Sequence, residues 1–233
     1  MKVALCVIAT GKYTRFLPQL LESATEFFCR GHEVSYQVLS NHDPGDAGGV
    51  DLTPETAKRI LWHHIDHEPW PGPTLHRYRM MLTAEPSLRK QDYLYYIDAD
   101  MFFAESVGDE VFGRLTATIH PGFANQPKRK WTFEKRRKSQ AFVSWTDAAH
   151  YYCGGFQGGS QYLEAMAVMD AMIRCDEQRG IIPVWHDESV WNAHLVKHPP
   201  DTILSPLYCS PDRWKLAGRK IVAIDKNHAE VRS

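Results

Sequence analysis

Two aspartates two residues apart, Asp98 and Asp100, directly follow the apolar stretch 93–97. Hard carboxylate oxygens that converge on one point suit Mg²⁺ or Mn²⁺, and such an ion neutralises a diphosphate. The apolar stretch is typical of a buried strand, and ligands in open α/β sheets collect at the carboxyl ends of strands. A pair of solvated turn aspartates, or an aspartate that caps the next segment, is the alternative interpretation, and both stay open.

A second group of chemically capable residues is the run Trp185-His186-Asp187-Glu188-Ser189. Two adjacent carboxylates could supply an ionised base or nucleophile and an acceptor for a sugar hydroxyl, and Trp185 offers a stacking face. The same residues also suit the start of a helix, where Asp187 would be a good cap and acids meet the positive end of the helix. Without further context the run favours the helix start.

Two further stretches could contact a ligand. Seven Lys and Arg residues lie between 128 and 138 with aromatic residues among them, a pattern that suits nucleic-acid phosphates or a loop that orders over another anion. The stretch 154–159 is rich in glycine but fits neither standard phosphate-binding motif, so we expect close backbone approach to a ligand. Together with the aspartate pair, the basic stretch allows a second hypothesis, a metal-dependent phosphoryl-transfer enzyme or nuclease.

The periodicity of apolar residues predicts the elements that position these groups. An opening strand, helix and strand is typical of an α/β nucleotide-binding layer. No internal repeat or low-complexity linker divides the chain, so we expect one domain. The predicted strands are 2–9, 34–39, 60–64, 93–97, 115–119 and 221–224, and the predicted helices are 16–29, 74–88 and 161–174.

Composition narrows the class of protein. The 233 residues carry 27 Lys and Arg against 28 Asp and Glu, a net charge of −1, which weakens a duplex-binding interpretation. The 43% apolar content is that of a folded domain and not of a disordered chain. No apolar run approaches the ~20 residues needed to cross a bilayer. Five cysteines without CxxC spacing make a disulfide framework and a structural zinc site improbable and fit a reducing cytoplasm.

The order of these motifs along the chain is similar to that of a known protein family. After the aspartate pair come HPGF at 120–123, YYCGGFQGGS at 151–160, WHDES at 185–189 and KNH with VR near the end. In this order the chain resembles glycosyltransferase family 6, the family of the histo-blood-group A and B transferases and the α-1,3-galactosyltransferases. The resemblance implies a GT-A fold, an α/β domain with a UDP-binding half to about residue 105 and an acceptor-binding half after it.

The family transfers galactose or N-acetylgalactosamine from a UDP-sugar to the 3-hydroxyl of a β-galactoside with retention of configuration, usually with Mn²⁺. The resemblance therefore implies that Asp98 and Asp100 bind Mn²⁺ or Mg²⁺, and that EDTA abolishes activity. The implied donor-binding positions are Ile8, Ala9, Thr10, Tyr13, Arg77, Asp98, Ala99, Asp100, Gly154, Gly155, Asp187, Lys226 and Arg232.

Glu188 matches the carboxylate that acts in this family as nucleophile or stabilises the transition state, and His120, Thr132 and Trp185 match acceptor positions. Because Gly155 has no Cβ, the sugar's 2-substituent has room for an acetamido group, which predicts preference for UDP-N-acetylgalactosamine. The expected acceptor is a galactoside with α-1,2-linked fucose, with no nucleic-acid partner. The animal enzymes carry an amino-terminal membrane anchor that is not seen here, which predicts a cytoplasmic bacterial or phage protein, or a soluble fragment.

Overall fold

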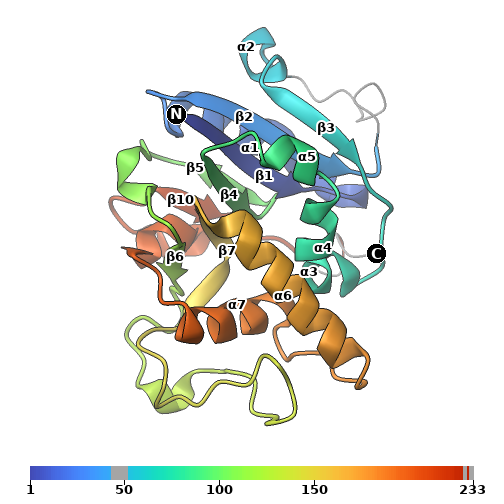
Figure 1. Ribbon diagram of the computed structural model, residues 1–233. Coiled ribbons are helices and arrows are strands. Elements are labelled where there is room, and N and C mark those ends of the chain that lie inside the picture. The colour runs from blue at the N-terminus through green and yellow to red at the C-terminus, as the bar shows by residue number, and fades with distance from the viewer. Residues whose placement is uncertain (43–51, 228–229, 231–233) are drawn as a thin grey trace.

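A computed structural model describes residues 1–42, 52–227 and 230 of the chain (Figure 1). The strands are β1 (Lys2–Ile8), β2 (Glu33–Ser40), β3 (Ile60–His64), β4 (Tyr93–Ile97), β5 (Met101–Phe103), β6 (Thr116–Ile119), β7 (Tyr152–Gly159), β8 (Thr202–Leu204), β9 (Ser210–Pro211) and β10 (Ile221–Ala223). The α-helices are α1 (Leu17–Phe27), α2 (Pro54–Ala57), α3 (Gly72–Leu75), α4 (Arg77–Leu82), α5 (Glu85–Leu88), α6 (Tyr162–Glu177) and α7 (His186–Lys197). Short 3₁₀ helices include η1 (Gly11–Phe16) and η3 (Lys128–Lys130).

A mixed seven-stranded sheet in the order β3-β2-β1-β4-β7-β6-β8 forms the centre of the fold. Strands β3, β2, β1 and β4 are parallel, whereas β7 runs antiparallel to both β4 and β6. A small sheet, β5-β10-β9, lies beside it. The predicted α/β class is confirmed, and the antiparallel β7 makes the sheet mixed. Among the described residues, no helix combines the length and apolar character that a membrane span requires.

Alternating side chains of β1 build a core on each face of the sheet, because successive strand residues point to opposite sides. Val3, Leu5 and Val7 pack with α1, which buries leucines on one face. Ala4 and Cys6 pack on the other face with residues of α4, α6 and α7. Each fully buried aliphatic side chain of this kind contributes roughly 1.5–3 kcal/mol. The predicted two-faced burial of the first strand is therefore confirmed.

Proline positions explain two helices that the sequence predicted with wrong bounds. The predicted helix 74–88 is three short helices, α3, α4 and α5, and Pro86 lies in the first turn of α5. Because Pro86 has no N–H to donate to an earlier carbonyl, the helix has to restart before it. The predicted helix 16–29 begins as the 3₁₀ helix η1 and becomes α1 at Leu17, with Pro18 in its first turn.

The glycine-rich stretch forms most of β7, every residue of which is buried. Packing explains its last two glycines: a Cβ on Gly158 would lie 2.3 Å from the Leu94 carbonyl oxygen, and Gly159 has a φ of +131°. The prediction of ligand approach was therefore wrong for these two glycines. Gly154 and Gly155, at the other half, remain next to the acidic residues described below.

Candidate active site

A cavity of about 330 Å³ opens at the carboxyl ends of β1 and β4. The strand order reverses there, since the chain leaves β1 toward β2 on one side and later places β4 on the other. Open α/β sheets bind ligands in the crevice at such a switch point. The lining residues include Ile8, Thr10, Tyr13, Arg77, Asp98, Ala99, Asp100 and Lys226. Of the other predicted donor-binding positions, Ala9 is fully buried and does not line the cavity, and Arg232 lies outside the described residues.

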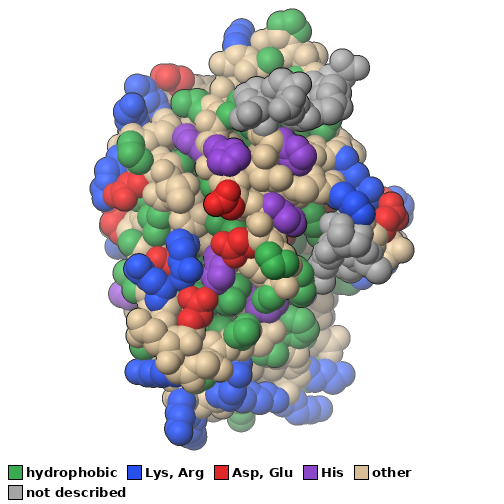
Figure 2. Space-filling model, turned by 90° about the vertical axis from the view of Figure 1, so that its right-hand side faces the viewer, with side chains coloured by type: hydrophobic (Ala, Val, Ile, Leu, Met, Phe, Trp, Pro, Cys, Tyr) green, Lys and Arg blue, Asp and Glu red, His purple; other side chains and the backbone are tan. Residues whose placement is uncertain are grey.

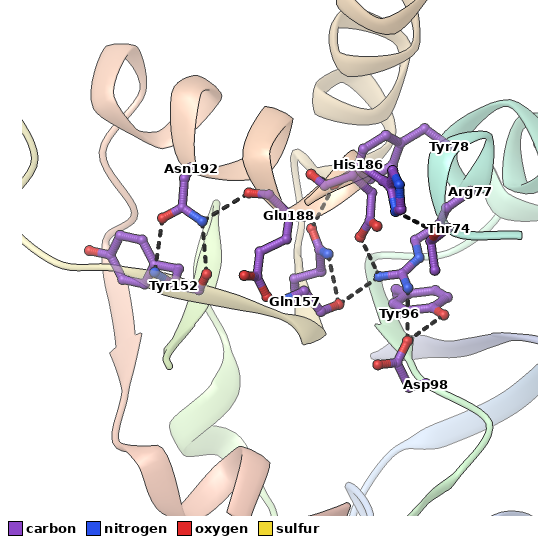
Figure 3. Close-up of polar contacts among 12 residues, drawn as sticks. Thr74, Arg77, Tyr78, Tyr96, Asp98, Tyr152, Gln157, His186, Glu188 and Asn192 are labelled. Carbon is purple, nitrogen blue, oxygen red and sulfur yellow. Dashed lines mark hydrogen bonds and ion pairs between the residues drawn. The ribbon is translucent and has the colours of Figure 1, made fainter. Parts of the chain in front are cut away.

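Arg77, at the start of α4, is the hub of the polar network (Figure 3). Its guanidinium donates to the Gly154 carbonyl at 2.7 Å and forms ion pairs with Asp98 at 2.9 Å and Asp187 at 2.7 Å. It also lies 4.0 Å from the centre of the Tyr96 ring. Burial opposes the charge, but the surrounding acids, first Asp187, carry the pKa of Arg77 well above its ordinary value. Arg77 therefore joins the aspartate at the end of β4 to the start of α7.

Asp98 and Asp100 present their carboxylates to the cavity in different surroundings. Asp98 accepts hydrogen bonds from Arg77 and, at 2.8 Å, from the Tyr96 hydroxyl. Asp100 is paired with the Lys226 ammonium, which also lies 5.2 Å from the Tyr13 ring. Because Asp100 already pairs with Lys226 at the cavity wall, its carboxylate is positioned to bind a positive charge there.

The donor set at this edge fits a hard divalent ion bound together with a diphosphate. In the described part of the chain, no three His, Cys, Asp or Glu side chains gather closely enough to hold a metal by themselves. Mg²⁺ in particular is commonly held by one or two carboxylates and completes its shell with water and substrate phosphates. Asp98 and Asp100 satisfy that smaller requirement.

Glu188 lies in the first turn of α7, and main chain and side chain both hold its carboxylate. Oε2 accepts from the Gly154 N–H at 2.9 Å, and Oε1 accepts from the Tyr151 hydroxyl at 3.0 Å. Burial raises the pKa of Glu188 to about 7 despite these hydrogen bonds, and nearby Asp187 adds to the rise. Burial likewise raises the pKa of Asp187 to about 7, although Arg77 opposes the shift. Two carboxyl groups with pKa values raised toward neutrality in one cleft are typical of an active site.

The register between β4 and β7 sets the distance between Glu188 and the aspartate pair. Ile97 lies opposite Phe156, and the Asp98 N–H donates to the Gly155 carbonyl at 3.0 Å. Glu188 is bonded to the neighbouring residue, Gly154. The dipeptide Gly154-Gly155 thus separates the two acidic groups, and side chains there would press on both. A Cβ on Gly154 would lie 3.0 Å from Asp187 Oδ2, and one on Gly155 would lie 3.2 Å from Asp98 Oδ2.

Two buried amides hold β7 and α7 in this relation (Figure 3). Asn192 exchanges hydrogen bonds with the main chain of Tyr152, at 2.8 and 2.9 Å, and donates to the Glu188 carbonyl at 2.9 Å. Gln157 donates to the Gly154 carbonyl at 3.0 Å, and the Tyr78 hydroxyl donates to Gln157 at 3.3 Å. All of these polar groups are satisfied inside the protein, which fixes the geometry of the site.

The predicted acceptor residues lie on the other side of Glu188. Trp185 Nε1 donates to Thr132 Oγ1 at 2.8 Å, and Thr132 Oγ1 donates to the Tyr151 hydroxyl at 3.3 Å. Since Tyr151 bonds Glu188, a continuous chain of hydrogen bonds runs from Trp185 to the carboxylate. Thr132 and Trp185 also line an open cavity of about 530 Å³. His120 packs edge-on against Tyr151, with ring centres 5.6 Å apart, and burial lowers the pKa of His120 to about 4.

Comparison of the sequence with known proteins identifies the family of the chain. A family model described as "Glycosyltransferase family 6" matches residues 1–233. The chain belongs to glycosyltransferase family 6. It is therefore a glycosyltransferase of the GT-A type, as the resemblance implied. The phosphoryl-transfer hypothesis has no support from this match.

Relatives of the family 6 chain include animal and bacterial transferases. Histo-blood group ABO system transferase 1 of Rattus norvegicus is 35% identical over 99% of this chain and 68% of its own length. Globoside alpha-1,3-N-acetylgalactosaminyltransferase 1 of Homo sapiens is 34% identical over 91% of this chain and 62% of its own length. An O-antigen biosynthesis glycosyltransferase of Escherichia coli is 23% identical over 97% of this chain and 95% of its own length.

Several residues of the family 6 site escaped the sequence analysis. Four residues that no motif predicted line the first cavity: His67, Glu68, Trp70 and Thr74. His67 Nδ1 contacts Thr10 Oγ1 at 3.0 Å, which gives this polar residue a partner at the cavity wall. Asn192 could have been found, because it lies four residues after Glu188 and so on the same face of α7. Tyr151 is the first residue of the motif YYCGGFQGGS, but the sequence analysis gave it no role.

Proposed function

We propose that this chain is a retaining α-1,3-glycosyltransferase that moves N-acetylgalactosamine, or galactose, from the UDP-sugar to the 3-hydroxyl of a β-galactoside. The names of the relatives support the linkage, since the globoside enzyme is an alpha-1,3-N-acetylgalactosaminyltransferase. One observation carries the proposal. The Glu188 carboxylate accepts from the Gly154 N–H, and the Asp98 N–H donates to the carbonyl of the next residue of the same strand, Gly155. A sugar held between Glu188 and Asp98 would meet a carboxylate on one side and a diphosphate site on the other.

The first cavity suits the nucleotide part of the donor. Tyr13 and the end of β1 provide an aromatic and apolar wall for a base, while Lys226 and Arg77 provide positive charge for phosphate oxygens. Asp98 and Asp100 would hold Mn²⁺ or Mg²⁺, and the bound ion would supply Lewis-acid stabilisation of the charge that develops on the departing UDP. Arg77 holds Asp98 at the cavity for that task, and its charge favours the ionised form of the buried Asp187 against the effect of burial.

Glu188 is the proposed catalytic residue. Its carboxylate approaches the anomeric carbon from the face opposite UDP, as nucleophile or as the charge that stabilises an oxocarbenium-like transition state. One displacement inverts the anomeric centre and two restore it, which accounts for retention. The ionised form is required in either role, and the Gly154 N–H and Tyr151 hydroxyl favour that form. Asp187 is placed to accept a hydrogen bond from a donor-sugar hydroxyl.

The small residues at the sugar site support the choice of donor. Asp98, Cys209 and Met101 already approach within 3.2–3.3 Å of the position of a Cβ on Gly155. A larger residue there would take space from the sugar's 2-substituent, so glycine favours the bulkier N-acetylgalactosamine. The acceptor side is formed by His120, Thr132 and Trp185, with Trp185 as a stacking face for a galactoside with α-1,2-linked fucose.

A transfer screen detected by mass spectrometry tests the proposal. Both UDP-sugars are offered to β-galactosides with and without α-1,2-linked fucose, with Mn²⁺ or with EDTA. We expect Mn²⁺-dependent transfer to the 3-hydroxyl, faster with UDP-N-acetylgalactosamine and with the fucosylated acceptor. Faster galactose transfer would contradict the donor assignment. Inverted product, or full activity of Glu188→Gln, would contradict the assigned mechanism.

A further inference from the structure

The proposed transferase chemistry does not use the cations of the strongly basic segment that follows the His120 region. We call the exposed Lys and Arg side chains of residues 128–138 the basic face. The segment holds seven Lys and Arg against one acid, Glu134, a local charge of +6 in a chain whose net charge is −1. All seven cations are exposed. They are Lys128, Arg129, Lys130, Lys135, Arg136, Arg137 and Lys138.

Two buried acids bind the main chain near the basic face, which holds the segment that carries the cations in place. Glu134 accepts from the main-chain N–H of Arg136 at 2.8 Å and of Val184 at 2.9 Å. Buried Asp176 accepts from the Ser139 hydroxyl at 2.5 Å and from the Gln140 N–H at 2.8 Å. Because the acids contact the main chain, most of the cationic side chains are left to solvent.

Most of these cations have no acidic neighbour. Arg136 pairs with Glu134, and Lys128 donates to the Ala148 carbonyl at 2.6 Å. The other five form no ion pair with any carboxylate among residues 1–42, 52–227 and 230. Figure 2 shows Lys and Arg side chains gathered along the lower end of the molecule, where Figure 1 places the loop between β6 and β7. A positive field unopposed by nearby acids attracts an anionic surface.

Exposed apolar side chains adjoin the basic face. Segment 142–148 contacts it at both ends, through the Val143 N–H on the Glu134 carbonyl and through Lys128 on Ala148. Trp145, between these contacts, is 55% exposed. On the other side, Ile182 and Val184 are 50% and 46% exposed, and their main chain bonds Arg136 and Glu134. Cations combined with exposed Trp and aliphatic groups are typical of surfaces that lie in a membrane interface.

We propose that the basic face is a peripheral membrane-binding surface for anionic lipid. The exposed aliphatic Ile182 and Val184 favour lipid over nucleic acid, because aliphatic side chains bury in a membrane interface but offer bases no stacking surface. Thr132 belongs to the same segment, and Trp185 directly follows Val184. Binding therefore brings the acceptor side of the active site to the lipid surface, where a glycan carried on a lipid would meet it. This last consequence rests on the proposed function, whereas lipid binding does not.

Vesicle sedimentation tests the proposal without any UDP-sugar. The full chain is mixed with vesicles of phosphatidylcholine alone, or with one-third phosphatidylglycerol. We expect binding to the anionic vesicles only, weakened by salt. The test variant carries Arg129→Gln, Lys130→Gln and Lys138→Gln. Each cation near an anionic surface contributes about fivefold to binding, so the triple variant should bind about 100-fold more weakly.

A matched control neutralises three exposed cations remote from the basic face, with Arg30→Gln, Lys58→Gln and Lys90→Gln. It should bind anionic vesicles within about twofold of the wild type. Trp145→Ala, a second test that leaves all cations in place, should weaken vesicle binding severalfold. Loss in the control equal to that in the test variant would overturn the proposal, as would failure of the wild type to sediment. Tighter binding to single-stranded DNA than to anionic vesicles would assign the basic face to nucleic acid.

Activity measurements keep this proposal separable from the transferase assignment. The triple variant should transfer sugar to a soluble galactoside at the wild-type rate but be slower toward a galactoside-bearing lipid in anionic vesicles. Vesicle binding without any transfer would refute the proposed function and leave the membrane surface standing. Transfer without vesicle binding would refute the membrane-binding surface and leave the proposed function standing.

Discussion

Replacing Glu188 by Gln should stabilise the protein while it abolishes turnover. Burial raises the pKa of Glu188 from 4.5 to about 7, so the folded chain binds this proton more tightly than the unfolded chain does. The free energy of unfolding therefore falls as the pH rises from about 4.5 to 7, and the loss is complete above pH 7. At 1.36 kcal/mol for each pH unit, the charged carboxylate destabilises the fold by about 3 kcal/mol at pH 8.

A glutamine removes that charge and can keep both hydrogen bonds. Its carbonyl oxygen can accept from the Gly154 N–H, and its amide can donate to the Tyr151 oxygen, which then donates to Thr132. We therefore expect Glu188→Gln to raise the free energy of unfolding by about 3 kcal/mol at pH 8. The corresponding rise in Tm is about 6–12 °C. Turnover should fall by at least about 10³-fold, because the proposed nucleophile is gone.

Urea unfolding at pH 8 and pH 5 measures the effect, since the gain should fall to about 1 kcal/mol at pH 5, where Glu188 is protonated in the folded chain. Glu164→Gln is the matched control, because Glu164 is exposed on α6 and the same chemical change there should leave stability within about 0.5 kcal/mol. A Glu188→Gln variant less stable than wild type at pH 8, or equally stabilised at both pH values, would refute the desolvation argument.

Three other substitutions, one of them with a matched control, probe the network around the cleft. Arg77→Met should lower the free energy of unfolding by about 3–5 kcal/mol in urea, since Asp187 stays buried without its partner. By contrast Arg79→Met, at a side chain 40% exposed, should change it by less than about 1 kcal/mol. Asp100→Asn should lose the Mn²⁺-dependent part of the thermal stabilisation by UDP, and an unchanged shift in scanning fluorimetry would contradict the metal assignment. Tyr151→Phe should move the acidic limb of kcat/KM about one pH unit higher, because a hydrogen bond to ionised Glu188 is lost; an unmoved limb would disprove this role.

The sequence predicted the parts of the fold that depend on local patterns. The apolar runs 2–9 and 93–97 are buried on both faces, so their continuous hydrophobicity predicted β1 and β4, and the aspartates followed at the expected edge. Helix bounds were less predictable, because apolar spacing continues through Pro86 although the backbone hydrogen bonds do not. WHDES does start a helix, since α7 begins at His186, but Trp185 and not Asp187 occupies the cap position, and the same residues line the site.

Long-range pairing explains what sequence patterns could not reach. The link between Glu188 and Asp98 depends on the antiparallel register of β4 and β7, which brings residues far apart in the chain together. The wall formed by His67 comes from a segment without a motif, and only the folded chain brings it to Thr10. Tyr151 gained a role when the structure connected Thr132 to Glu188 through it. The roles of these side chains in catalysis remain predictions.

The charges of the cleft support the proposal that a divalent metal ion binds together with the donor. Four carboxylates, Asp98, Asp100, Asp187 and Glu188, face two cations, Arg77 and Lys226, so the fully ionised cleft has an excess of two negative charges. The raised pKa values of Asp187 and Glu188 show that burial disfavours this excess. A diphosphate would add to it, and like charges in a desolvated site repel strongly. A divalent ion held by Asp98 and Asp100 would offset this negative charge, so we expect the donor diphosphate to bind more tightly when Mn²⁺ or Mg²⁺ is present. Lys226 pairs with Asp100 at the same cavity, so its ammonium would supply further positive charge to the phosphate oxygens.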